Sequence, residues 1–172
     1  LAALLNALEC LRTEIPAGEH SITLRCGGVR PPLLRQSRTP IRVLPFGSEA
    51  DVEADLETAD LLYLPLPFDD VHDAFVRFSL STKLITYIGS GIPILYHGPE
   101  TATAFHLLRD AKAALLGTTL DSAAIAATLR HYAEHGDEGG CAENALRLAR
   151  SEFMLGTIRE RFWDSIQGCL AT

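Results

Sequence analysis

The amino-acid sequence predicts an α/β fold in which helices cover both faces of one open parallel sheet, a doubly wound arrangement. Short apolar segments, typical of buried strands, alternate with longer segments whose apolar residues recur at helical spacing. Glycines and prolines separate these segments where a helix or a strand has to end. Three helical segments follow the last strand, and the final two exceed what a doubly wound sheet needs, so we expect extra C-terminal helices.

Each expected element has a local reason in the sequence. Pro16 ends the first helix, Gly91 and Gly136 end two later ones, and Asp121 is a typical helix cap. We see no internal repeat and no low-complexity segment. In chain order we expect a helix at 1–15, strands at 21–26 and 41–45 joined by an irregular loop at 29–40, a helix at 49–58, a strand at 61–64, a short helix ending at Gly91, a strand at 92–96, a helix at 101–110, a strand at 113–116, and helices at 121–136, 141–151 and 155–170.

Residues 79–96 carry the most specific pattern of the chain. Ser79, Ser81 and Thr82 are of the types that cap exposed N–H groups at a helix start, and Lys83 adds a positive charge beside them. A helix start also favours an anion, because its N–H groups are unpaired and its dipole is positive there. The pattern therefore predicts either plain helix capping or phosphate binding, and the residues alone leave both interpretations open.

This pattern also carries a family resemblance. The series Ser-x-Ser-Thr-Lys-Leu-x-x-Tyr-x-x-x-Gly-x-Pro-Ile at 79–94 resembles the donor-binding motif of the two-domain, B-type (GT-B) glycosyltransferases, in particular the retaining family called glycosyltransferase group 1. Residues 59–65 resemble the strand that leads into that donor site, and residues 142–153 resemble the family's C-terminal helices. The likeness extends from about 41 to 162 and is stronger as a series than in any one motif.

The resemblance implies a single Rossmann-like domain over residues 1–172 that binds a nucleotide-diphosphate sugar. It also implies a longer two-domain protein whose N-terminal, acceptor-binding domain is absent from this sequence. The implied activity is transfer of the sugar to an acceptor by the full-length enzyme, with the isolated domain inactive. Backbone amides and Lys83 would stabilise the leaving diphosphate, so we expect no metal and no further cofactor.

The resemblance also assigns a donor site. The loop at 46–48 corresponds to the one that reads the nucleobase, largely through backbone groups, and the segment 79–83 to the one that holds the pyrophosphate. Arg77 is a further candidate for a phosphate contact and Thr86 for a ribose contact, whereas surface or capping roles are the alternatives for all of them. The implied donor-binding residues are Phe46, Gly47, Ser48, Arg77, Ser79, Ser81, Thr82, Lys83 and Thr86.

One departure from the family is functionally important. The wider family carries a spaced pair of glutamates that contact the sugar and the ribose, and the corresponding positions here are Phe78 and Thr86. Asp69, Asp70 or Asp73, just upstream, could reach the sugar instead, or could form a solvated acidic loop. No catalytic residue is therefore assigned. The alternatives to a transferase are a sugar-nucleotide epimerase of the same fold and a catalytically degenerate binding module.

Composition limits the partners and the location. A net charge of −7 over 172 residues argues against a nucleic-acid partner. No apolar run is long enough to span a membrane. The four cysteines show no paired spacing, which predicts reduced, mostly buried thiols and a cytoplasmic location, with peripheral attachment at the inner membrane face as the alternative for the full-length protein.

Two further expectations concern histidines and the last helix. The six histidines show no metal spacing, and His97, in the loop after the fourth strand, is the one placed at the ligand edge of the sheet. Phe162, Trp163 and Ile166 should form an apolar patch on the terminal helix, intended for the missing domain. In the isolated domain this patch should stay exposed or be covered by self-association.

Overall fold

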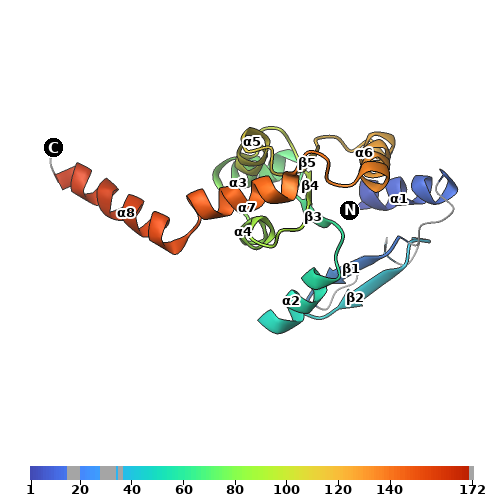
Figure 1. The fold of residues 1–172 in the computed structure, drawn as a ribbon. Helices are drawn as coiled ribbons and strands as arrows, with labels where there is room; N and C mark the ends of the chain where they lie inside the picture. The colour runs from blue at the N-terminus through green and yellow to red at the C-terminus, as the bar shows by residue number, and fades with distance from the viewer. Residues whose placement is uncertain (15–19, 28–33, 35–36, 171–172) are drawn as a thin grey trace. The chain divides into compact units, whose positions relative to one another are not determined.

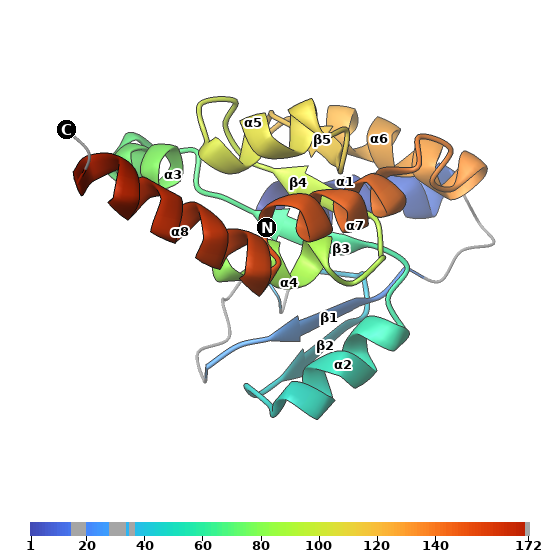
Figure 2. The ribbon, with the colours of Figure 1, turned by 60° about the vertical axis from the view of Figure 1, so that its left-hand side comes forward.

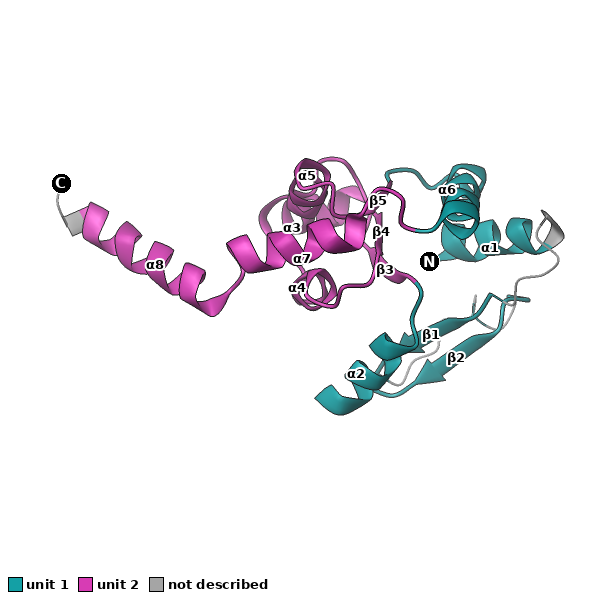
Figure 3. Ribbon diagram, in the orientation of Figure 1, with its two compact units in different colours: residues 1–60, 117–136 teal, residues 61–116, 137–172 magenta. Residues whose placement is uncertain are grey.

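The computed structural model describes residues 1–14, 20–27, 34 and 37–170. The chain divides into two compact units (Figure 3): unit 1 comprises Leu1–Asp60 and Gly117–Gly136, and unit 2 comprises Leu61–Leu116 and Asp137–Thr172. The expected stop at Pro16 and most of the expected loop at 29–40 lie outside the described residues. Whether both units belong to a single domain stays a prediction.

Two helices of unit 1 pack on each other, α1 (Ala2–Glu14) and α6 (Ser122–His135). Asp121 caps α6 by accepting a hydrogen bond from the backbone N–H of Ala123, and Gly136 ends it at a φ of 66°. Both helices were predicted from apolar periodicity, and their buried faces confirm it. The buried side chains are Ala3, Leu4, Leu5, Ala7 and Leu11 on α1, and Ile125, Ala126 and Leu129 on α6.

The other part of unit 1 is a two-stranded parallel sheet with one helix, drawn in Figure 2. Strands β1 (Ile22–Arg25) and β2 (Ile41–Leu44) pair with Ile22 opposite Ile41. Helix α2 (Glu49–Glu57) follows β2 and begins at the predicted Ser48 cap. None of the described residues of α2, β1 and β2 is fully buried, so the expected burial of residues 41–45 is wrong.

Unit 2 contains a three-stranded sheet in the order β3-β4-β5, in which β3 and β4 run parallel with Leu62 opposite Ile94. The chain crosses from β3 to β4 and then from β4 to β5, each time to the next strand in the same direction along the sheet. Crossovers of the same hand then place their helices on the same face of the sheet. Figure 1 accordingly shows α4 and α5 on one side of this sheet. The elements are β3 (Leu62–Pro65), η2 (Asp70–His72), α3 (Asp73–Phe78), α4 (Thr82–Ile88), β4 (Ile94–His97), α5 (Thr103–Asp110), β5 (Leu115–Gly117), α7 (Cys141–Glu152) and α8 (Leu155–Leu170).

The core of unit 2 surrounds β4, all four residues of which are buried. The sequence placed this strand two residues too early. Gly91 adopts a φ of 76°, so the chain is still turning there, and Pro93 precedes the first paired residue. The side chains buried around β4 include Leu62, Leu64, Val76, Leu84, Ile88, Phe105 and Leu108.

The structure is thus α/β with parallel strands, as predicted, but the five strands of its described residues lie in two small sheets instead of one. A strand inside a doubly wound sheet is apolar on both faces, as β4 is. By contrast, β1 ends in Arg25, and the exposed Arg42 lies in the middle of β2. The charged side chains explain why these two strands are only half-buried.

Three smaller expectations are corrected or confirmed. Asp69, Asp70 and Asp73 do not form an acidic loop, because η2 begins at Asp70 and α3 at Asp73. The cysteines are not mostly buried, since Cys10 and Cys169 are exposed. On α8, Phe162 and Trp163 are 56% and 52% exposed, whereas Ile166, the third residue of the expected patch, is only partly exposed. No helix among the described residues has both the length and the apolar character needed to cross a membrane.

Candidate functional site

The loop at 46–48 connects β2 to α2 in unit 1. Phe46 is 75% exposed. Ser48 and Asp51 form a reciprocal capping box: the Ser48 backbone N–H donates to Asp51 Oδ2 at 2.8 Å, and the Asp51 N–H donates to Ser48 Oγ at 3.3 Å. The hydroxyl and N–H of Ser48 are therefore already engaged. Within the described residues the N–H groups of Phe46 and Gly47 have no partner, so both are available backbone donors of this loop.

The capping box also sets the charge state of Asp51. The hydrogen bond from the Ser48 hydroxyl, followed by the one from the Ser48 backbone, lowers the pKa of the Asp51 carboxyl. Hydrogen bonds that favour the charged form of an acid have this effect. Asp51 is thus a carboxylate at neutral pH and accepts bonds at the start of α2.

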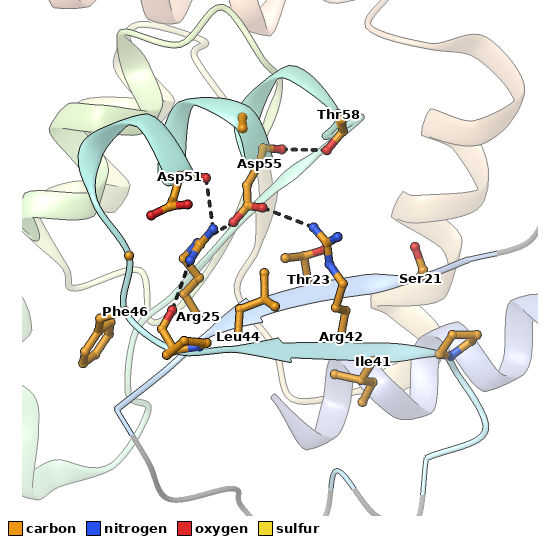
Figure 4. A pocket seen from close by; sticks show the side chains of 14 residues that line it. Ser21, Thr23, Arg25, Ile41, Arg42, Leu44, Phe46, Asp51, Asp55 and Thr58 are labelled. Carbon is orange, nitrogen blue, oxygen red and sulfur yellow. Dashed lines mark hydrogen bonds and ion pairs between the residues drawn. The ribbon is translucent and has the colours of Figure 1, made fainter.

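A depression borders this loop between α2 and the β1–β2 sheet (Figure 4). Two ion pairs cross it: Arg25 Nε lies 2.5 Å from Asp55 Oδ2, and Arg42 Nη2 lies 3.2 Å from Asp55 Oδ1. Two arginines facing Asp51 and Asp55 leave the depression without a net charge. Sequence reasoning missed it, because neither arginine carries a local signal. Its lining residues are Ser21, Thr23, Arg25, Pro40, Ile41, Arg42, Leu44, Pro45, Phe46, Gly47, Asp51, Ala54, Asp55 and Thr58.

The predicted pyrophosphate segment lies in unit 2, between α3 and α4. Ser79 is the C-terminal cap residue of α3 and Ser81 the N-terminal cap residue of α4. The Ser81 side chain makes no capping hydrogen bond within the described chain. Plain capping, the alternative interpretation, therefore does not account for this hydroxyl. Because α4 has only seven residues, its dipole adds little, and any anion site here depends on side chains.

Thr82, Lys83 and Thr86 lie on the exposed side of α4, opposite the buried Leu84 and Ile88. Residues three and four positions apart are neighbours on a helix surface. Within the described residues, the two hydroxyls and the Lys83 ammonium make no hydrogen bond or ion pair with protein groups. Two hydroxyls and one cation are thus grouped there.

Arg77 differs from Lys83 because it already has a partner. Its Nε lies 2.8 Å from the Asp73 carboxylate, one turn earlier on α3. Its backbone carbonyl accepts a hydrogen bond from the Thr103 hydroxyl. An anion at Arg77 would compete with Asp73, so Lys83 is the stronger candidate for a phosphate contact.

Two of the three acidic residues upstream, Asp69 and Asp73, are also engaged locally. Asp69 Oδ1 accepts a hydrogen bond from the His72 backbone and lies 2.6 Å from His72 Nδ1. These bonds, the side-chain one first, lower the pKa of Asp69. Phe78, at one of the positions where the resembled family has a glutamate, is 85% exposed. The two family positions, Phe78 and Thr86, thus hold no acid, and whether Asp70 reaches a sugar instead stays a prediction.

A partly buried polar pair, missed by sequence reasoning, lies at the carboxyl end of the unit 2 sheet. The Tyr63 hydroxyl on β3 is 2.6 Å from Nδ1 of His97 on β4, and the Phe68 ring meets the His97 ring edge-on. His97 is the last residue of β4, so its expected place in the following loop is wrong, and it is 2% exposed although it lies at the carboxyl end of the strand. Burial raises the pKa of Tyr63 to about 12.

The predicted site residues therefore form two groups, 46–48 in unit 1 and 77–86 in unit 2. Whether both contact one ligand stays a prediction. Within the described residues no three His, Cys, Asp or Glu side chains are arranged to hold a metal ion. No protein-family model matches the chain, and no curated protein matches it either.

Proposed function

We propose that the chain is the nucleotide-sugar-binding domain of a B-type glycosyltransferase that resembles group 1. The observation that carries the proposal is the exposed side of α4, where Thr82, Lys83 and Thr86 present polar groups without protein partners among the described residues. An unpaired ammonium beside hydroxyls suits the oxygens of a diphosphate. The resemblance of residues 79–94 to a donor-binding motif points to the same ligand.

The position of α4 in the chain supports this assignment. α4 belongs to the crossover that leads from the carboxyl end of β3 to the start of β4. Its first residues consequently lie toward the carboxyl edge, where open parallel sheets bind ligands. The proposal includes a doubly wound, Rossmann-like sheet as the architecture of the complete domain. A cytoplasmic location, with the inner membrane face as the alternative, belongs to the same proposal.

The proposed chemistry is electrostatic. In the full-length enzyme the bond between the sugar's anomeric carbon and the diphosphate oxygen breaks, and negative charge develops on the leaving diphosphate. Lys83 and neighbouring backbone amides stabilise that charge, which lowers the barrier without a metal ion. The acceptor would be held mainly by an N-terminal domain, so the present chain binds the donor weakly and transfers nothing.

Titration calorimetry of the chain with ADP, GDP and UDP tests the proposal. One lysine contact to a diphosphate is worth about 1.5–3 kcal/mol. Lys83→Ala should therefore weaken binding of the preferred diphosphate about 10- to 100-fold. Lys112→Ala is the matched control, because it removes the chain's other lysine from the end of α5 and should leave the affinity unchanged.

Two results would contradict the proposal. If the Lys83→Ala variant and the unmodified chain bind the diphosphate with equal affinity, Lys83 on α4 is not part of the donor site. Absence of binding to all three diphosphates would favour the degenerate module. If diphosphates bind, product analysis with the full-length enzyme separates the two enzyme classes: a transferase releases nucleoside diphosphate, whereas an epimerase returns an isomerised donor.

A further inference from the structure

The side chain of Arg25 connects the end of β1 to the loop at 46–48. Its Nη1 donates to the Pro45 carbonyl at 3.1 Å, just before the loop, and its Nη2 donates to the Asp51 carbonyl at 3.0 Å, just after it. Its Nε donates to Asp55 at 2.5 Å. The side chain is 19% exposed. One guanidinium group thus spans the loop from both ends (Figure 4).

Two glycines show how closely β1 approaches this loop. A Cβ added at Gly47 would lie 2.6 Å from Arg25 Nη1 and 2.7 Å from Asp51 Cβ, so a larger residue would require both side chains to shift. A Cβ added at Gly27 would lie 2.8 Å from Phe46 Cε2. The Phe46 ring therefore lies against the backbone at the end of β1, and its 75% exposure leaves room for a flat ligand.

We propose that Arg25 is a positioning residue that holds the loop at 46–48 in the conformation in which it binds a planar, uncharged group, the nucleobase of the donor. This inference rests on the proposed function. Arg25 does not act as an anion contact, because each of its three nitrogens donates to a protein acceptor and Asp55 neutralises its charge. A depression without net charge suits a nucleobase better than a phosphate.

Arg42 provides a matched comparison within the same cluster. It pairs with the same Asp55 carboxylate, at 3.2 Å, but it donates no bond to the segment 45–51 among the described residues. Its side chain is 61% exposed. Removal of either arginine takes one cation away from Asp55, and only removal of Arg25 releases the loop.

The test compares Arg25→Met, Arg25→Lys and Arg42→Met by NMR relaxation and by binding. The backbone order parameter of Gly47 should fall from about 0.85 to below about 0.6 in Arg25→Met, and stay near the rigid value in Arg42→Met. Arg25→Met should weaken binding of a nucleoside without phosphate about tenfold and leave inorganic pyrophosphate binding unchanged. Arg25→Lys keeps the charge but lacks the planar fork, so it should behave like Arg25→Met even if the latter folds poorly.

The outcomes separate this inference from the proposed function. An unchanged Gly47 order parameter in both Arg25 variants overturns the positioning role, whether or not nucleotides bind. Equal loosening in Arg42→Met overturns it too, because Asp55 alone would then explain the effect. Weakening of pyrophosphate as strong as that of nucleoside would make Arg25 an anion contact instead. If Gly47 loosens but the unmodified chain binds no nucleotide, the proposed function fails, and only the positioning of the loop by Arg25 stands.

Discussion

The Tyr63 hydroxyl lies 2.6 Å from Nδ1 of His97 and joins β3 to β4 through side chains in addition to the backbone ladder. His97 is 2% exposed, so a polar atom of its ring that loses this partner has little access to water. Burial also keeps the Tyr63 hydroxyl protonated far above neutral pH, with a pKa of about 12. Tyr63 can therefore act as the donor and His97 Nδ1 as the acceptor.

Tyr63→Phe should destabilise the protein by about 1–3 kcal/mol, because it leaves a buried imidazole nitrogen without its hydroxyl partner. Denaturant unfolding followed by circular dichroism measures the change. Tyr87→Phe is the control: Tyr87 is half-buried, and its hydroxyl makes no hydrogen bond within the described residues. If both variants lose the same free energy of unfolding, the hydrogen bond between Tyr63 and His97 does not stabilise the protein.

The capping box at α2 predicts a pH dependence with a defined sign. The pKa of Asp51 is lowered, first by the Ser48 hydroxyl, so the carboxylate form is favoured in the folded state. The carboxylate's contribution to folding stability is fully present above the ordinary aspartate pKa of about 3.9. It is lost as the pH falls through the lowered pKa of the folded state. Ser48→Ala should raise the Asp51 pKa toward the ordinary value in a carboxyl-detected NMR titration.

Asp69 is an internal control in the same spectra. Its pKa is lowered by His72 and not by Ser48, so it should be identical in the two proteins. A pKa of Asp51 that stays low in Ser48→Ala would show that the backbone bond or the charge of Arg25 dominates instead.

Helices were largely predictable because their signals are local. The cap at Ser48 and the cap at Asp121 lie beside the helices that they start, and both begin within one residue of the expected position. The helix at 73–78 was missed because Asp73, its first residue, was assigned with Asp69 and Asp70 to a solvated acidic loop. The Asp73–Arg77 pair, one helical turn apart, was the available signal for it.

Strand pairing and side-chain partners were not predictable in the same way. The contact between Tyr63 and His97 follows only once the register is known, with Pro65 opposite His97. The hydrogen bonds of Arg25 require β1, the loop after β2 and α2 to lie together. Nothing in the sequence of any one of these segments indicates that it contacts the other two. In contrast, the position of Lys83 at an exposed helix start was predicted correctly, because the spacing of apolar and polar residues within α4 itself separates its buried side from its exposed side.

The terminal helix α8 predicts self-association of the chain. Phe162 and Trp163 are 56% and 52% exposed, with ring centroids 5.3 Å apart, and Ile158 lies one turn before Phe162 with 47% exposure. Burying one such side chain is worth about 1.5–3 kcal/mol, so a second copy that covers this stripe gains stability at each residue. We expect a dimer whose population rises with concentration in analytical ultracentrifugation.

Phe162→Gln should weaken that association at least about tenfold, since it removes the central apolar contact of the stripe. Phe78→Gln is the matched control, because Phe78 is 85% exposed but lies on α3, outside the stripe. Trp163 is the only tryptophan of the chain, so its fluorescence reports on this helix alone. Its emission should move to shorter wavelength as the chain is concentrated, in Phe78→Gln as in the unmodified protein, and stay fixed in Phe162→Gln. A monomer at every concentration, with unchanged emission, would rule out self-association. The stripe on α8 would then be expected to bind a surface other than a second copy of the chain.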